Sequence, residues 1–139
     1  MALFLEESFA LIDDAREALE RWRADPNNSL EIETLQRDLH TIKGCARMAD
    51  VPPIGDLCYE LEMLYRQMSD GRLRAGDYLF DLLEHSHSHV RAQLEAVRDG
   101  REVPLGGELI EALQQFAVAP EEQLSEPASV TLMPVVESP

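Results

Sequence analysis

The sequence predicts an all-α protein: an antiparallel up-and-down four-helix bundle with a short fifth helix and a disordered C-terminal tail. Apolar residues recur at steps of three and four in several consecutive segments. Clusters of Pro, Gly, Asp and Asn separate those segments, and no segment has the alternating pattern of a strand strongly enough to compete. The short connections favour neighbouring helices that pack antiparallel.

The first two predicted helices are separated by a cluster of helix-breaking residues. The first covers about residues 3–24 and stops at Asp25-Pro26-Asn27-Asn28. Asn28, with Glu31 three residues later, has the pattern of an N-terminal cap for the second helix, which ends near Asp50. Each helix has one apolar stripe: Leu5, Phe9, Ile12, Ala15, Leu19 and Trp22 in the first, and Ile32, Leu35, Leu39, Ile42, Ala46 and Ala49 in the second.

Three more helices are predicted before the helical periodicity ends. The third begins at Pro52-Pro53 and ends at Ser69-Asp70-Gly71, and it forms an antiparallel hairpin with the second. The fourth covers about residues 76–98 and the shorter fifth about 107–117. We therefore expect a helical bundle over residues 1–117 and a disordered tail or interdomain linker over residues 118–139.

Composition restricts the location and the partners of the chain. No apolar stretch approaches the roughly 20 residues that span a bilayer, and the first residues lack the basic flank of a signal peptide. We therefore expect a cytoplasmic protein without a membrane partner. The 27 acidic residues against 12 basic ones give a formal net charge of −15, which disfavours nucleic acid and favours proteins as partners. Cys45 and Cys58 lie within helical patterns and are expected to be reduced thiols.

His40 is predicted to project from the second helix into solvent. At about 100° per residue, it lies roughly 130° from the centre of the apolar seam. Lys43 is the only lysine in the chain, and it follows one turn later, close enough for both side chains to contact one phosphoryl group. Gly44 lies on the same outer face, although glycine within a helix costs about 1 kcal/mol relative to alanine. Its missing side chain would let another protein approach His40 closely.

The chemistry of an imidazole makes His40 a candidate nucleophile. Near an ordinary pKa of about 6.5, much of an imidazole is neutral at neutral pH, and a neutral ring nitrogen can attack phosphorus. The Lys43 ammonium could offset the charge of the phosphoryl group. His40 is ten residues before Asp50, and Glu62 is ten residues after Pro52, so both lie at similar height in an antiparallel pair. Glu62 is therefore expected to reach His40 as the carboxylate that orients the ring.

One segment resembles the phospho-accepting helix of histidine-containing phosphotransfer (HPt) domains: His40-Thr41-Ile42-Lys43-Gly44, continued by Cys45-Ala46-Arg47-Met48-Ala49. The resemblance is to the HPt modules of chemotaxis-type sensor histidine kinases, including those of type IV pilus pathways, and with the helical layout it extends over about residues 1–117. It implies phosphoryl carriage on His40, an assisting Lys43, a small residue at Gly44 and a hydrogen-bonding Glu62. Many relatives have glycine in place of Asp50, ending the helix in a left-handed turn that Asp tolerates at modest cost.

These observations together predict a phosphorelay carrier. His40 would accept a phosphoryl group from a histidine kinase catalytic domain or from a receiver's aspartyl-phosphate, and would pass it to a response-regulator receiver domain. The sequence has no Gly-rich phosphate loop, so we expect a phosphocarrier without its own ATP site, free-standing or part of a larger histidine kinase. It is expected to bind no cofactor, with Mg on the partner kinase or receiver, and to be a monomer as an isolated domain.

Other interpretations of single features stay open. A helical adaptor or dimerisation module would present the same surface without carrying phosphate. His85, His87 and His89 have the spacing of a metal site, but His87 lies at the edge of the apolar stripe, so all three cannot converge on one ion. Arg47 would either contact partners or balance the acidic surface. Cys45 would be a redox switch or, more simply, a structural thiol.

Overall fold

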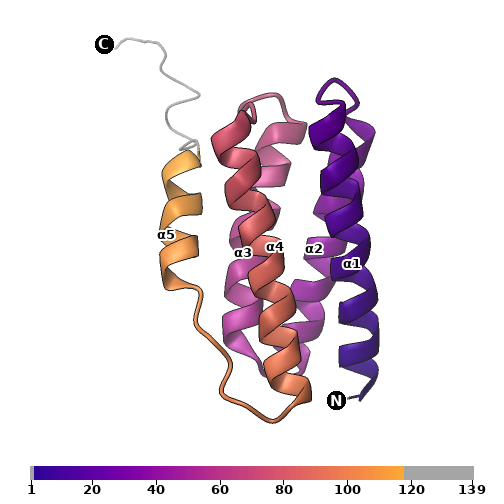
Figure 1. Cartoon of the computed structure of the whole chain (residues 1–139), viewed down its shortest axis with the longest axis vertical. Coiled ribbons are helices and arrows are strands. Elements are labelled where there is room, and N and C mark those ends of the chain that lie inside the picture. Colours follow the sequence, from indigo (N-terminus) through magenta and orange to yellow (C-terminus); the bar gives the residue numbers. More distant parts are fainter. Residues whose placement is uncertain (1, 118–139) are drawn as a thin grey trace, which may run out of the picture.

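A computed structural model of the chain describes residues 2–117, and it contains five helices there, each antiparallel to the next within the bundle (Figure 1). The helices are α1 (Ala2–Ala24), α2 (Leu30–Met48), α3 (Pro52–Ser69), α4 (Asp77–Arg98) and α5 (Gly107–Phe116). The predicted all-α bundle with a short fifth helix is confirmed. The tail predicted over residues 118–139 lies outside the described residues.

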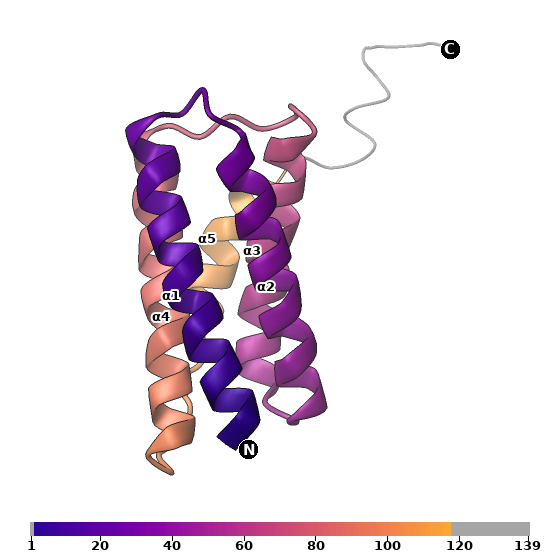
Figure 2. The same cartoon turned by 90° about the vertical axis from the view of Figure 1, so that its right-hand side faces the viewer.

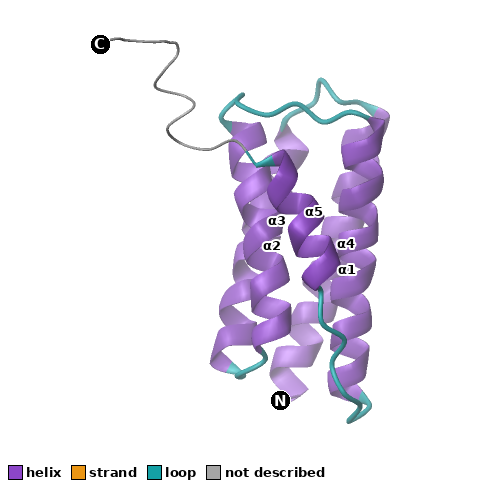
Figure 3. Cartoon of the chain, turned by 90° about the vertical axis from the view of Figure 1, so that its left-hand side faces the viewer, coloured by secondary structure: helices purple, strands orange, loops and turns teal. Residues whose placement is uncertain are grey.

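The four long helices surround one apolar core. Both α1 and α3 pack against α2 and α4. Figure 2 shows α1 between α2 and α4. The short α5 lies outside, against α3 and α4 (Figure 3), and buries Leu113 there. The predicted seam of α2 is in the core, because Leu35, Leu39, Ile42 and Ala46 are all fully buried. Among residues 2–117, none of the helices is both long enough and apolar enough to span a bilayer.

The start of α2 differs in one respect from the predicted cap. The Asn28 side chain accepts a hydrogen bond from the backbone N–H of Leu30 at 3.2 Å, while Ser29 at the cap position makes no such bond. Glu31 does not return to the helix backbone, because the Arg21 guanidinium of α1 binds its carboxylate at 3.0 and 3.1 Å. The predicted reciprocal capping pattern is therefore wrong, since a cross-helix ion pair holds the glutamate.

The end of α2 sets its alignment with α3. Asp50 has a φ of 61°, the left-handed conformation that the family pattern assigns to glycine. The N–H of Val51 donates to the carbonyl of Ala46 at 2.9 Å, and that of Asp50 to the carbonyl of Arg47 at 3.2 Å. This pair of bonds is the Schellman motif, and α3 begins directly after it at Pro52. The departure from glycine therefore leaves the turn between α2 and α3 intact.

Two histidines of α4, His87 and His89, take structural positions. His87 is fully buried and its Nε2 lies 2.7 Å from the Tyr65 hydroxyl of α3; burial lowers the pKa of His87 to about 3, so the ring is neutral. His89 Nε2 donates to the carbonyl of Leu105 at 3.1 Å and thereby fixes the connection to α5. His85 is exposed. Within residues 2–117, no group of three or more His, Cys, Asp and Glu side chains is placed to hold a metal ion.

Asp38 is a buried acidic residue two positions before His40. It interacts with Asp14 of α1, and it is only 3% exposed. Its Oδ2 atom has no hydrogen-bond partner among the described residues. Burial, followed by hydrogen bonding and charge from the Asp14 carboxyl, raises the pKa of Asp38 to about 7. The folded state therefore holds a proton that the unfolded chain releases near pH 4.

Asp38→Asn is expected to stabilise the protein most at and above neutral pH. Because the folded pKa is raised, the wild-type chain loses stability as pH rises from about 4 to about 7, and the loss is complete above that range. The asparagine cannot ionise, so urea unfolding at pH 8 should give a free energy of unfolding higher by about 1–3 kcal/mol, with little difference at pH 3. Glu6→Gln, on the exposed surface of α1, is the control and should show no such pH dependence. An equal effect at both pH values would contradict the assignment.

Candidate functional site

His40 lies on the outer face of α2, as the helical angle predicts. Its side chain is 64% exposed, whereas the nearby seam residues Leu39 and Ile42 are fully buried. The ring is turned toward α3, where its Nδ1 lies 2.9 Å from Oε2 of Glu62. The contact joins residues 22 positions apart in the sequence, across the α2–α3 hairpin. The expected approach of Glu62 to His40 is thus present.

Glu62 is a buried carboxylate with three partners. Its side chain is 3% exposed, and Oε1 lies 2.7 Å from Nζ of Lys43. Oε2 contacts both His40 and, at 3.1 Å, Nη2 of Arg66 one turn later on α3. Burial opposes ionisation, but Lys43 and His40 together outweigh it and lower the pKa of the Glu62 carboxyl. An ionised carboxylate only accepts, so Nδ1 of His40 carries a proton, and in the neutral ring the lone pair lies on Nε2.

Lys43 makes a contact with Glu62 that the sequence did not predict. Its side chain is 14% exposed, and its ammonium lies on Glu62 and 5.6 Å from the centre of the Tyr59 ring. His40 and Lys43 therefore meet at the two oxygens of one carboxylate. In this arrangement the ammonium is held at the protein side of the imidazole, where it supports the ionised state of Glu62.

Gly44 leaves open space beside His40. A Cβ atom added at Gly44 would meet no atom within 4 Å outside its own helix turn. The surface one turn beyond His40 is therefore uncrowded, as predicted. Arg47 is exposed and lies away from this open surface. It lines a hollow of about 270 Å³, together with Asp56, Tyr59, Glu60 and Ile110. It faces acidic residues of α3.

An open hollow of about 440 Å³ lies against the imidazole. Besides His40 and Glu62, its walls include two arginines, Arg37 of α2 and Arg66 of α3; Glu33 and Gln36 complete them. Neither arginine was predicted from the sequence as a residue of the site. The signals were present, because Arg37 precedes His40 by three residues and Arg66 follows Glu62 by four, spacings that place side chains on a common helix face. In a chain with eleven arginines, however, such spacings are common.

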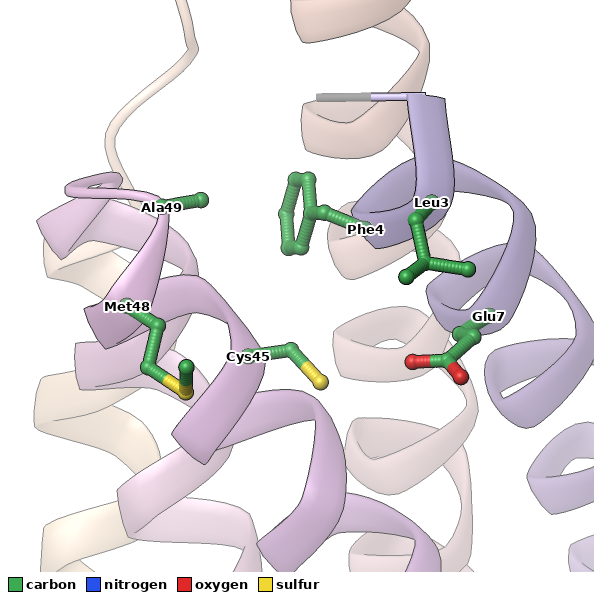
Figure 4. Close-up of a pocket in the computed structure, with 6 residues that line it drawn as sticks. All are labelled: Leu3, Phe4, Glu7, Cys45, Met48 and Ala49. Carbon is green, nitrogen blue, oxygen red and sulfur yellow. The ribbon is translucent and has the colours of Figure 1, made fainter.

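A third hollow, of about 300 Å³, lies further along α2, between its C-terminal end and the first turns of α1 (Figure 4). Its lining is mostly apolar and consists of Leu3, Phe4, Glu7, Cys45, Met48 and Ala49. Cys45 is half-buried there, and burial raises the pKa of its thiol. A raised pKa keeps the thiol protonated and unreactive, which favours the structural interpretation over a redox switch.

Comparisons with known proteins identify the family to which the helices of this site belong. The family model described as "Hpt domain" matches residues 1–100. The chemotaxis protein CheA of Borreliella burgdorferi is 30% identical over 101 residues, which are 73% of this chain and 12% of that protein, so the chain spans about an eighth of its relative's length. The phosphorylated P1 domain of CheA3 from R. sphaeroides, solved in complex with CheY6, has the same fold, with a TM-score of 0.73 and 21% identity over 82% of this chain and 91% of that one.

The matched residues include both helices that build the site, together with α1 and α4. The matching family is that of the histidine phosphotransfer domains, and histidine phosphotransfer is the function that the sequence predicts. The exposed imidazole on α2 is the feature that such a function needs, and it is present. The chain belongs to the Hpt domain family, and its sequence and fold are similar to those of chemotaxis-type kinases.

Proposed function

We propose that this chain is a phosphorelay carrier in which Nε2 of His40 accepts a phosphoryl group and passes it to a response-regulator receiver domain. One observation carries the proposal: an exposed imidazole is held through Nδ1 by a buried, ionised carboxylate. This hydrogen bond leaves the lone pair on the ring nitrogen that does not contact Glu62. The nucleophile is thus fixed in its tautomer and orientation before any partner arrives.

The neighbouring residues support distinct parts of this role. Glu62 orients the ring and stabilises the positive charge that develops on it when Nε2 forms a bond to phosphorus. Lys43 keeps Glu62 ionised and adds positive charge to the site through that contact. Gly44 lets the active-site loop of a receiver approach the imidazole, and Arg47 lies within reach of the same partner on the next turn.

The partners supply what the described residues do not provide. A histidine kinase catalytic domain would bring ATP, and Mg would be bound by that domain or by the receiver. A receiver as acceptor is supported by the solved complex of the phosphorylated P1 domain of CheA3 with CheY6. We further propose that the chain acts within a longer CheA-like kinase, as its match to part of such a protein suggests. The cytoplasmic location, the monomeric state and the type IV pilus pathway stay predictions.

His40→Gln is expected to abolish phosphorylation without unfolding the bundle, because the side chain lies outside the core. The chain is incubated with a phosphorylated receiver or a kinase catalytic domain and ATP, and acid-labile label is counted. His85→Gln, an exposed histidine on α4, is the matched control and should keep full labelling. Label that persists in His40→Gln would show that another residue accepts the group. A wild-type chain that takes no label from either donor would favour the helical adaptor.

Lys43→Ala is expected to slow phosphoryl transfer roughly tenfold, the effect of losing about one charge-assisted contact. The bundle should stay folded, because His40 and Arg66 still contact Glu62. Rapid-quench measurement of transfer to a receiver gives the rate, and circular dichroism monitors helix content. Lys43→Arg keeps the charge and should recover part of the rate. A transfer rate equal to that of the wild type would remove Lys43 from the mechanism.

Gly44→Leu is expected to stabilise the helix and to weaken receiver docking. A Cβ atom at this position meets no neighbour within 4 Å, and replacing a helical glycine contributes roughly 0.5–1 kcal/mol to stability. The same side chain would stand between His40 and an approaching loop. Titration calorimetry with a receiver measures the affinity, and Ser88→Leu on α4 is the control of equal bulk. Normal affinity in Gly44→Leu would mean that the open surface has another origin.

A further inference from the structure

Two guanidinium groups, those of Arg66 and Arg37, line the hollow beside His40. Arg66 is 48% exposed, and its Nη2 contacts the same oxygen of Glu62 that accepts from His40. Arg37 is exposed, lines the same hollow and forms no ion pair with any residue between positions 2 and 117. The Glu62 carboxylate already has Lys43 on its other oxygen. Lys43 and Arg66 therefore share one carboxylate, which also accepts from His40.

Phosphorylation of His40 would make Arg66 less important as a counter-ion of the Glu62 carboxylate. When the lone pair of Nε2 forms the bond to phosphorus, the ring retains its Nδ1 proton and becomes positively charged. The hydrogen bond from His40 to Glu62 then becomes an ion pair, and Lys43 still occupies the other oxygen. At the same time a phosphoryl group with a charge of about −2 is introduced on the outer side of the ring. The Arg66 guanidinium thus becomes surplus at Glu62 as an anion appears next to it.

We propose that the hollow receives the phosphoryl group on His40, and that Arg66 moves its contact from Glu62 to the phosphoryl oxygens, with Arg37 as the second cation. This inference rests on the proposed function. A guanidinium suits the task because its planar fork of N–H donors matches two oxygens of a phosphoryl group. The exposure of Arg66 allows the movement, whereas Lys43 is held between Glu62 and Tyr59. Glu33 is the other carboxylate in the hollow and opposes the anion from the rim.

The test requires no protein partner. The full chain is treated with phosphoramidate, whose phosphorus–nitrogen bond breaks as the bond from Nε2 of His40 forms, with ammonia leaving. Phosphorus NMR then follows the phosphohistidine signal against pH. In Arg66→Gln the midpoint of the phosphoryl ionisation should move to higher pH, because the dianion has lost a cation. The rate of phosphorylation should fall about tenfold. Arg66→Lys, which keeps the charge without the fork, should give intermediate values.

A matched control removes the same charge elsewhere. Arg101 contacts Asp99 beyond the end of α4, so Arg101→Gln should leave both the midpoint and the rate unchanged. If Arg66 acted only by holding Glu62, the nitrogen spectrum of the imidazole would change while the phosphorus midpoint stayed constant, and the inference would be overturned. An unchanged midpoint and rate would overturn it as well.

The same experiment separates this inference from the function on which it rests. If the wild-type chain gives no phosphohistidine signal, or His40→Gln gives the same signal, the proposed phosphorylation of His40 fails. If the signal depends on His40 but Arg66→Gln behaves as the wild type, the proposed function stands and only the role of Arg66 is lost.

Discussion

The ionised carboxylate of Glu62 is the group on which the site depends. A charge buried to this extent is stable only when it is paired, and its partners come from both helices of the hairpin. His40 and Lys43 approach from α2, and Arg66 approaches from α3 itself. Each of these side chains is therefore positioned by the same buried oxygen atoms. The orientation of an exposed ring is in this way determined from within the protein.

The hairpin turn makes this meeting possible. The left-handed Asp50 and the Schellman bonds end α2 abruptly, and Pro52 begins α3 with only Ala49 to Val51 between the two helices. Any additional residue in the turn would shift α3 along α2 and separate Glu62 from His40. The core holds α3 in place on its other side, since Tyr65, one turn from Glu62, bonds the buried His87 of α4. The bundle interior and the site thus share one helix.

Much of this arrangement could be predicted from the sequence, because it follows from helical geometry. Steps of three and four placed the seams, the angle of His40 from the seam placed it in solvent, and equal distances from the turn placed Glu62 opposite. Side-chain conformation could not be predicted in the same way. The long side chain of Lys43 can turn to either side of the helix, and the buried charge of Glu62 determines which. The ion pair that draws Glu31 away from its cap depends on Arg21 of α1, a contact between helices that helical spacing alone does not specify.

The two nitrogens of the His40 ring are in contrasting environments. One nitrogen holds a proton against Glu62, and the other is available for phosphoryl transfer. Nδ1 faces a buried carboxylate, where a proton is held in one place and a developing positive charge is stabilised. The ring as a whole stays 64% exposed, so the phosphoryl side is surrounded by water until a partner covers it. Water weakens the electrostatic stabilisation of a transition state, so the carrier alone gives little acceleration. In the proposed function, a partner that closes over Gly44 would exclude that water and would supply its own metal ion, so rapid transfer would depend on formation of the correct complex.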